Sequence, residues 1–252
     1  YDPNDLAFVL ATYLPLTIYL LIISKNILYK FFFLFFVISM AAGIIVSQSR
    51  GGILALGCII FFLILYKNKN WKKKYKIFIM LFLLFSSSLY IPLIENRFKN
   101  IENDYNITGE GGRLHIWRQN MEIFVNNLIF GTGANCSMIS LGFHRVSEGE
   151  NYRAWQVTHS SLIQVAVETG FPGLLLFCFL NIAAIKNLRK IRQKKNNRLN
   201  TISFFLEISF YGFWASALFL SHAYSIHLYM LLAMASSIQF IGENNDRRNE
   251  LI

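Results

Sequence analysis

Arg50 stands in the stretch SQSRGG (47–52), between two apolar runs. A charge there is costly unless the guanidinium reaches the membrane interface or an anionic partner. The two glycines that follow, and the small or polar residues before it, favour a tight turn open to a ligand. An arginine that merely extends to lipid headgroups explains the position equally well. Arg50 is therefore a candidate anion-binding residue, with lipid contact as the alternative.

Two further arginines, Arg113 and Arg118, lie five residues apart in the stretch GRLHIWR (112–118). The sequence predicts a helix start here, where the positive helix end and a guanidinium fork both favour phosphate oxygens. The alternative is a solvated helix face that contacts headgroups, and this alternative fits Arg118 better than Arg113. The spacing of the two residues does not decide between them.

His159, in the stretch THSSL (158–162), lies where a polar segment enters an apolar run. A histidine in such a place can act as a general base, because the unperturbed pKa of imidazole is close to neutral pH. A structural histidine held by hydrogen bonds is the commoner case. His222, in the turn LSHAY (220–224), is a second and weaker candidate for the same role.

Acidic residues inside the apolar runs give no metal signature. Glu168 and Glu207 are expected to face the bundle interior, as intramembrane acids usually do. Glu168 is expected to be a structural partner of a basic group, and is only a secondary candidate for the site. Glu148 and Glu150 lie near His144, but they form no recognisable cluster of metal ligands, and no HExxH pattern occurs. We expect no metal and no cofactor.

The composition indicates that the solvent of this chain is a lipid bilayer. Of its 252 residues 54% are hydrophobic, and they form runs of membrane-spanning length. The net charge of +10 comes from basic residues in short connections between these runs, which is typical of orientation signals, so nucleic acid is not an expected partner. The three cysteines are scattered and predict no disulfide.

Seven apolar runs predict an all-α, polytopic transmembrane helix bundle, because only helices satisfy their own backbone groups in lipid and barrel-type alternation is absent. The runs are Leu6–Ser24, Phe31–Ser47, Gly52–Tyr66, Ile77–Ile94, Ser160–Ile185, Ile202–Leu220 and Tyr224–Ile241. We expect one membrane domain over 1–252. Because the chain starts with Tyr1 and no signal peptide precedes the first run, we also expect that it is a fragment that lacks N-terminal helices.

The basic residues predict the orientation. Connections after the first, third, fifth and seventh runs hold 17 of the 24 Lys and Arg residues, which places them in the cytoplasm. The opposite side then carries the SQSRGG and LSHAY turns and a long loop, 95–158. This loop is too long to be a mere connector, and 114–130 has the apolar spacing of an amphipathic helix that lies on the membrane face. The leading candidates Arg50, Arg113, His159 and His222 all fall on this outer side.

Three segments together resemble the O-antigen ligase and polymerase superfamily. They are SQSRGGILAL around Arg50, GRLHIW…FGTGAN over 112–135, and HSSLIQVAVETGFPG over 159–173. The resemblance implies a metal-independent, inverting transfer of a glycan from a polyprenyl (undecaprenyl) diphosphate donor to an acceptor hydroxyl. Arg50 and Arg113 match the family's diphosphate-binding arginines, and His159 matches its proposed base. The family commonly has Asn after this histidine, whereas Ser160 stands here.

The resemblance further implies the partners and the location of the protein. The acceptor would be lipid A–core, as in O-antigen ligation, or a growing glycan, as in polymerisation of repeat units. The site would face the periplasm from the bacterial inner membrane. The opening YDPND (1–5) also resembles members once labelled bicarbonate transporters, so a transporter is the more distant alternative. A transporter would be expected to show broken helices and polar groups near the bilayer midplane.

Overall fold

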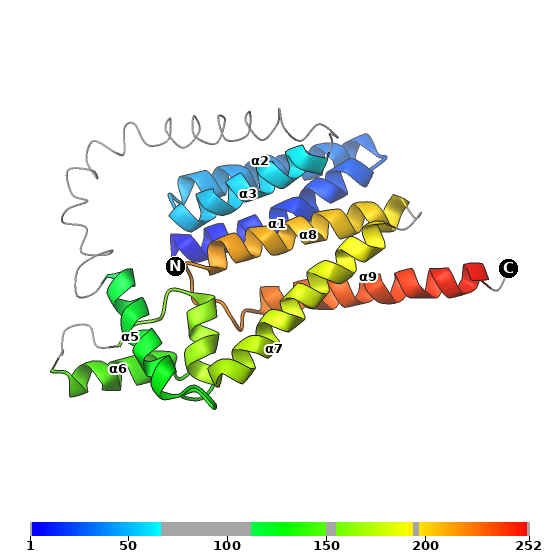
Figure 1. Ribbon diagram of the computed structural model, residues 1–252. Helices are drawn as coiled ribbons and strands as arrows, with labels where there is room; N and C mark the ends of the chain where they lie inside the picture. Colours follow the sequence, from blue (N-terminus) through cyan, green and yellow to red (C-terminus); the bar gives the residue numbers. More distant parts are fainter. Residues whose placement is uncertain (1, 67–111, 150–154, 194–196, 251–252) are drawn as a thin grey trace. The chain divides into compact units, whose positions relative to one another are not determined.

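The computed structural model describes residues 2–66, 112–149, 155–193 and 197–250, and their regular structure is entirely helical (Figure 1). The helices of this part are α1 (Pro3–Ile23), α2 (Ile27–Val46), α3 (Arg50–Tyr66), α5 (Arg113–Asn126), α6 (Ser137–Ser147), α7 (Ser161–Arg192), α8 (Asn197–Ala217) and α9 (Ile226–Glu250). The predicted all-α fold is confirmed.

Six of the seven predicted apolar runs coincide with described helices, and the run Ile77–Ile94 lies outside the described residues. Four described helices are long and apolar enough to cross a bilayer: α1, α2, α7 and the part Ile226–Asn244 of α9. The apolar α3 is shorter, with 17 residues. The protein is thus a multi-pass helical membrane protein, while the number of seven spans stays a prediction.

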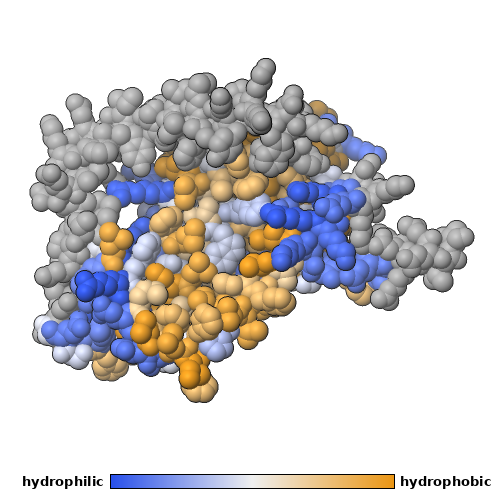
Figure 2. Space-filling view, in the orientation of Figure 1, coloured by the Kyte–Doolittle hydropathy of each residue, from blue (hydrophilic) through white to orange (hydrophobic). Residues whose placement is uncertain are grey.

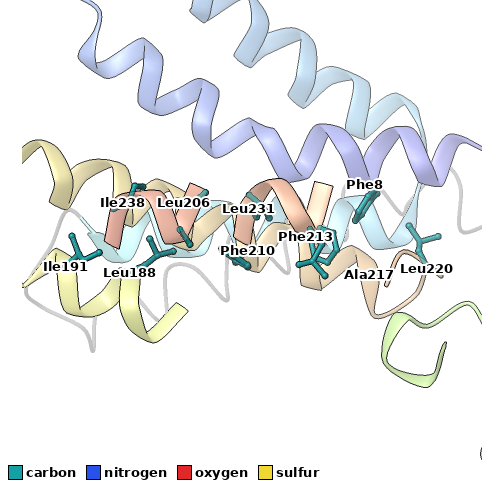
Figure 3. Close-up of a cluster of buried hydrophobic side chains, with 12 residues drawn as sticks. Phe8, Leu188, Ile191, Leu206, Phe210, Phe213, Ala217, Leu220, Leu231 and Ile238 are labelled. Atoms are coloured by element: carbon teal, nitrogen blue, oxygen red, sulfur yellow. The ribbon is translucent and has the colours of Figure 1, made fainter. Parts of the chain in front are cut away.

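The chain divides into two compact units, and each is described by itself. The first unit comprises 1–59 and 174–252, and the second comprises 60–173. The core of the first unit is centred on α8, whose Phe210 and Phe213 are completely buried (Figure 3). Phe8 of α1 and Leu231 of α9 pack into the same cluster. Because α8 is enclosed by other helices, it also accommodates buried serines and Glu207 among its apolar residues.

The outer surface of the first unit is apolar where it would meet lipid. Helix α2 exposes a row of large side chains, among them Phe31, Phe32 and Phe35. The middle of α7 exposes Leu176 and Phe179, and Figure 2 shows this apolar surface beside a hydrophilic one where α7 ends and α8 begins. Apolar patches of this extent are rare on proteins that live in water, so this surface fits a bilayer.

The first unit has two distinct ends. At one end the starts of α1 and α3 meet the end of α8: a Cβ on Gly52 would lie 2.5 Å from Ala7, and Ser216 donates a hydrogen bond to the Gly51 carbonyl at 3.3 Å. At the other end of the unit, the last turns of α7 contact α8 and α9. These contacts fit the predicted grouping of connections into two sides within this unit. Which side faces the cytoplasm remains a prediction.

The second unit contains α5, α6 and the beginning of α7. Helix α5 buries Ile116, Ile123 and Phe124, and these residues confirm the amphipathic helix predicted over 114–130, although the helix ends at Asn126. Helix α6 was not predicted. It packs against α5 and contains the fully buried Leu141, and the ring of Trp155 covers it so closely that a Cβ on residue 142 would lie 2.2 Å away.

Candidate functional site

Arg50 is the exposed first residue of α3 in the first unit. The turn before it is tight, as the sequence predicted, because Gln48 adopts a left-handed backbone with φ of 52°. The side-chain oxygen of Ser49 then accepts a hydrogen bond from the Gly52 N–H at 3.2 Å and so caps the helix. This arrangement places a guanidinium beside the positive end of a helix, a combination that suits an anion.

Arg113 has the same local setting in the second unit, since it is the half-buried first residue of α5. The N-cap residue is Gly112, which has no side chain to bond the first-turn N–H groups. Such N–H groups, together with a guanidinium fork, form a common binding arrangement for phosphate oxygens. The predicted helix start at this motif is confirmed.

His159 lies close to the helix that carries Arg113. The indole N–H of Trp117 donates a hydrogen bond to the carbonyl of Thr158, the residue before His159, at 2.9 Å. Arg113 precedes Trp117 by four residues, so the two side chains lie on the same face of α5. The second unit therefore brings the cationic helix start and the imidazole-bearing segment into one neighbourhood, which residue spacing in the sequence did not reveal.

The backbone of His159 is strained. Its φ of 51° lies in the left-handed region, which non-glycine residues rarely adopt, and the strain is held by the surrounding chain. The Thr158 hydroxyl donates to the Ser160 carbonyl at 3.2 Å, and the Gln164 N–H donates to the same carbonyl at 2.9 Å as α7 begins. A fixed, half-exposed imidazole at a helix start is suited to receiving a proton from a bound hydroxyl.

Arg145 of α6 is a buried residue near the site that the sequence did not single out. Its side chain is completely buried, and it donates to Gln119 of α5 at 2.6 Å and to Gln156 at 2.7 Å. One guanidinium thus joins α5, α6 and the segment that leads to His159. The signal in the sequence was an arginine retained on a side from which basic residues are largely excluded.

The FGTGAN and ETGFPG motifs bind each other. Helix α7 is broken at Gly170, where φ is 67° and ψ is −171°. Before the break, the carbonyl of Val167 accepts a hydrogen bond from the Thr132 N–H at 2.8 Å, and that of Glu168 accepts from the Gly133 N–H at 3.0 Å. After the break, the N–H of Phe171 donates to the Leu128 carbonyl at 2.7 Å. The loop 128–133 therefore satisfies the backbone groups that the break exposes.

Among the described residues Glu168 has no basic partner, although one was expected. In the described part of the chain its carboxylate accepts from the backbone N–H of Asn135 at 3.0 Å and from Ser137, whose N–H lies at 3.3 Å and hydroxyl at 2.6 Å. That prediction was wrong because the partners are neutral groups more than thirty residues earlier in the chain. Glu168 fixes the start of α6 on α7, so it positions structure and has no contact that suggests chemistry.

The remaining candidates have ordinary contacts. Arg118, with 80% of its side chain exposed, pairs with Glu122 on the same helix at 3.2 Å. His222 lies in the first unit, where its Nε2 is 2.8 Å from an Asp5 oxygen and its ring stacks on Phe8. Glu207 faces the interior as predicted, and Arg189 donates to it at 2.6 Å.

Comparison with known protein families gives a match to this chain. Residues 34–178, more than half of the chain, match the family described as O-antigen ligase. No curated protein and no solved structure gives a significant match. The matched range contains all three motifs, from Arg50 through Arg113 to His159, together with the paired FGTGAN and ETGFPG segments. The chain therefore belongs to the O-antigen ligase family of membrane glycosyltransferases involved in polysaccharide biosynthesis.

Proposed function

We infer that this protein transfers a glycan from a polyprenyl diphosphate donor to an acceptor hydroxyl at the periplasmic face of the bacterial inner membrane, as in ligation of O-antigen to lipid A–core. The observation that carries this proposal is the hydrogen bond between Trp117 and Thr158, because it joins the helix that starts at Arg113 to the segment that ends at His159. Family membership supplies the reaction class.

The proposed step is a single displacement. The acceptor hydroxyl oxygen forms a bond to the anomeric carbon while the bond from that carbon to the diphosphate breaks, which inverts the configuration. The diphosphate leaves with the electron pair, and the hydroxyl proton passes to the imidazole of His159. Negative charge grows on the leaving diphosphate, so the guanidinium of Arg113 and the adjacent helix start stabilise the transition state more than the ground state.

Arg50 is proposed as the second arginine for the diphosphate. Its support is the motif resemblance and its position as the first residue of a helix, a position that Arg113 also has. Arginine suits this role better than lysine, since its planar fork can bind two phosphate oxygens at once. No metal is required in this scheme, because the two cations and the helix starts supply the positive charge.

Repeat-unit polymerisation is the same reaction with a growing glycan as acceptor. A transporter is less well supported, although α7 is broken. Transporter breaks expose backbone groups to an ion or substrate, whereas the groups freed at Gly170 are occupied by the loop 128–133.

The test is a transfer assay with the purified full-length protein, a polyprenyl-diphosphate-linked glycan and an acceptor. Arg113→Ala, Arg50→Ala and His159→Ala should each lower the rate by at least ~100-fold. Arg113→Lys separates charge from geometry and should recover only part of the loss. Lys190→Ala, at an exposed cation on α7, is the matched control and should retain the wild-type rate. An unchanged transfer rate in all three site variants would contradict the proposal.

The acceptor is distinguished in cells. A strain that lacks the gene should lose long chains on its lipid core if the protein is a ligase, and should show single repeat units if it is a polymerase. A normal glycan profile would contradict both forms of the proposal.

A further inference from the structure

A histidine and two glutamates come together between α5 and α6. The Nε2 atom of His144 lies 3.4 Å from a carboxylate oxygen of Glu122 and 3.6 Å from one of Glu148, and the three ligand atoms all lie within 4.8 Å of one another. Glu122 comes from α5, His144 from the last turn of α6, and Glu148 is the residue that ends α6. The sequence predicted no such group, because it places Glu122 more than twenty residues before the other two.

We propose that Glu122, His144 and Glu148 form a binding site for a divalent transition-metal ion of the zinc class. Zinc is held at about 2.0–2.2 Å by histidine nitrogen and carboxylate oxygen. Tetrahedral bonds of that length separate neighbouring ligand atoms by ~3.3 Å, so the observed 3.4 and 3.6 Å need only a small adjustment. Three protein ligands leave the fourth position to water.

The surroundings of the His144 Nε2 atom favour a bound metal cation over a simple ion pair with the two glutamates. The Nε2 atom is buried from solvent, yet among the described residues it makes no hydrogen bond, although two carboxylates lie close to it. A buried polar atom without a hydrogen bond costs about 1–3 kcal/mol. A metal ion bound between the three groups would use the lone pair of this nitrogen and remove that penalty.

The surroundings orient one of the ligands. Arg118 holds the Oε1 atom of Glu122 at 3.2 Å, which leaves Oε2 directed toward His144. Carboxylates that bind metals are commonly held in this way by a second group. Arg145, the residue after His144, donates hydrogen bonds to Gln119 and Gln156.

Metal binding is expected to stabilise the contact between α5 and α6. A metal bound to both helices would stabilise the arrangement that Arg145 also maintains. Glu122 follows Arg113 on α5 by nine residues, more than two helical turns, so the role proposed for this site is structural or regulatory and not part of the transfer step.

The test uses the full-length protein in detergent, purified with a tag that contains no histidine and washed with a chelator. Titration with Zn²⁺ in a calorimeter should show one saturable site per chain, and the apparent melting temperature should rise with zinc. Mg²⁺ should not reproduce either effect, because a nitrogen ligand disfavours this hard ion.

Variants separate the proposed site from adventitious binding. His144→Ala should weaken zinc binding at least ~10-fold and abolish the thermal shift, and Glu148→Gln, at a half-exposed residue that tolerates change, should weaken both. His115→Ala, a histidine of α5 outside the cluster, should keep both. The proposal is overturned if wild-type protein binds no zinc, if Mg²⁺ acts equally, or if His144→Ala and Glu148→Gln bind as the wild type does.

Discussion

Glu168 is a buried carboxylate that is held by neutral donors. Its side chain is 1% exposed, and it accepts three hydrogen bonds from Asn135 and Ser137. Hydrogen bonds to a charged group each contribute about 1.5–3 kcal/mol, so they offset part of the desolvation of the carboxylate. The residue stabilises the docking of α6 on α7 without an arginine or lysine in the described part of the chain.

Glu168→Gln should therefore destabilise the protein by roughly 1–3 kcal/mol, because an amide nitrogen would face a backbone N–H that now has an acceptor. The measurement is the apparent melting temperature in detergent. Glu243→Gln, the same change at an exposed position of α9, is the control and should have little effect. Equal melting temperatures for the two variants would show that the hydrogen bonds of Glu168 contribute nothing.

Arg145 offers a second test at a single residue. Arg145→Lys keeps the charge but loses the fork that reaches Gln119 and Gln156 together, so the buried amide oxygen of Gln119 or the partly buried one of Gln156 would lose its donor. We expect a loss of about 1–3 kcal/mol in the free energy of unfolding, which is the cost of one such oxygen left without a partner. Thermal unfolding of the purified variant measures it.

Arg118→Lys is the matched control for this change. The Arg118 side chain is 80% exposed and its pair with Glu122 lies on the helix surface, so the effect should stay below ~1 kcal/mol. If the Arg145 variant is no less stable than the Arg118 variant, the buried guanidinium does not hold the two helices together.

Two glycines at the junction between α7 and the loop before α6 have no room for a side chain. A Cβ on Gly131 would lie 2.4 Å from the backbone of Glu168, and a Cβ on Gly170 would lie 2.6 Å from the Ile129 carbonyl oxygen. Both residues also have positive φ, which a side chain disfavours. The glycines of FGTGAN and ETGFPG thus allow the loop and the broken helix to approach closely.

Gly131→Ala and Gly170→Ala should each cost more than ~2 kcal/mol, from backbone displacement added to the left-handed penalty of about 1–2 kcal/mol. Gly149→Ala isolates the left-handed penalty, because this glycine has φ of 82° and no described atom lies within 4 Å of the added Cβ. Melting temperatures should fall clearly further for the first two variants than for the third. Similar falls in all three would mean that the close approach is unimportant.

The elements could be predicted from the sequence to different degrees. Apolar runs located α1, α2, α7 and α9, because an uninterrupted span of hydrophobic residues has few alternatives in lipid. Helix α6 escaped prediction, since its 11 residues form a short amphipathic segment in a polar loop. Short helices depend on tertiary packing, here against α5 and Trp155, which local sequence does not show.

Only some features of the candidate site could be predicted from the sequence. The residue types and motif positions identified Arg113 and His159, and the structure adds the Trp117 contact that relates them. The partners of Glu168 and Arg145 could not be predicted, because they depend on which distant backbone and amide groups the fold brings near. The break at Gly170 was hidden by the apolar residues that continue on both sides of it.

At the scale of the whole molecule, the arrangement of basic residues makes a prediction about sidedness. In the first unit the end of α7 carries Lys186, Arg189 and Lys190, while Arg50 lies at the opposite end with the start of α1. The positive-inside rule assigns the lysine-rich end to the cytoplasm. The second unit carries Cys136 in the loop that the same rule places outside, and Cys136 is a free, partly exposed thiol.

Labelling with a membrane-impermeant maleimide checks this sidedness in cells whose outer membrane has been made permeable. Cys136 should react without further treatment, because the rule places its loop on the outer side. In a variant that lacks the native cysteines, Lys190→Cys should react only after the inner membrane is opened, since that exposed position belongs to the cytoplasmic end. The apolar runs around Cys58 and Cys178 should keep both thiols unreactive in either condition. The reverse pattern, with Lys190→Cys labelled first, would place His159 and Arg113 in the cytoplasm, where a periplasmic acceptor could not reach them.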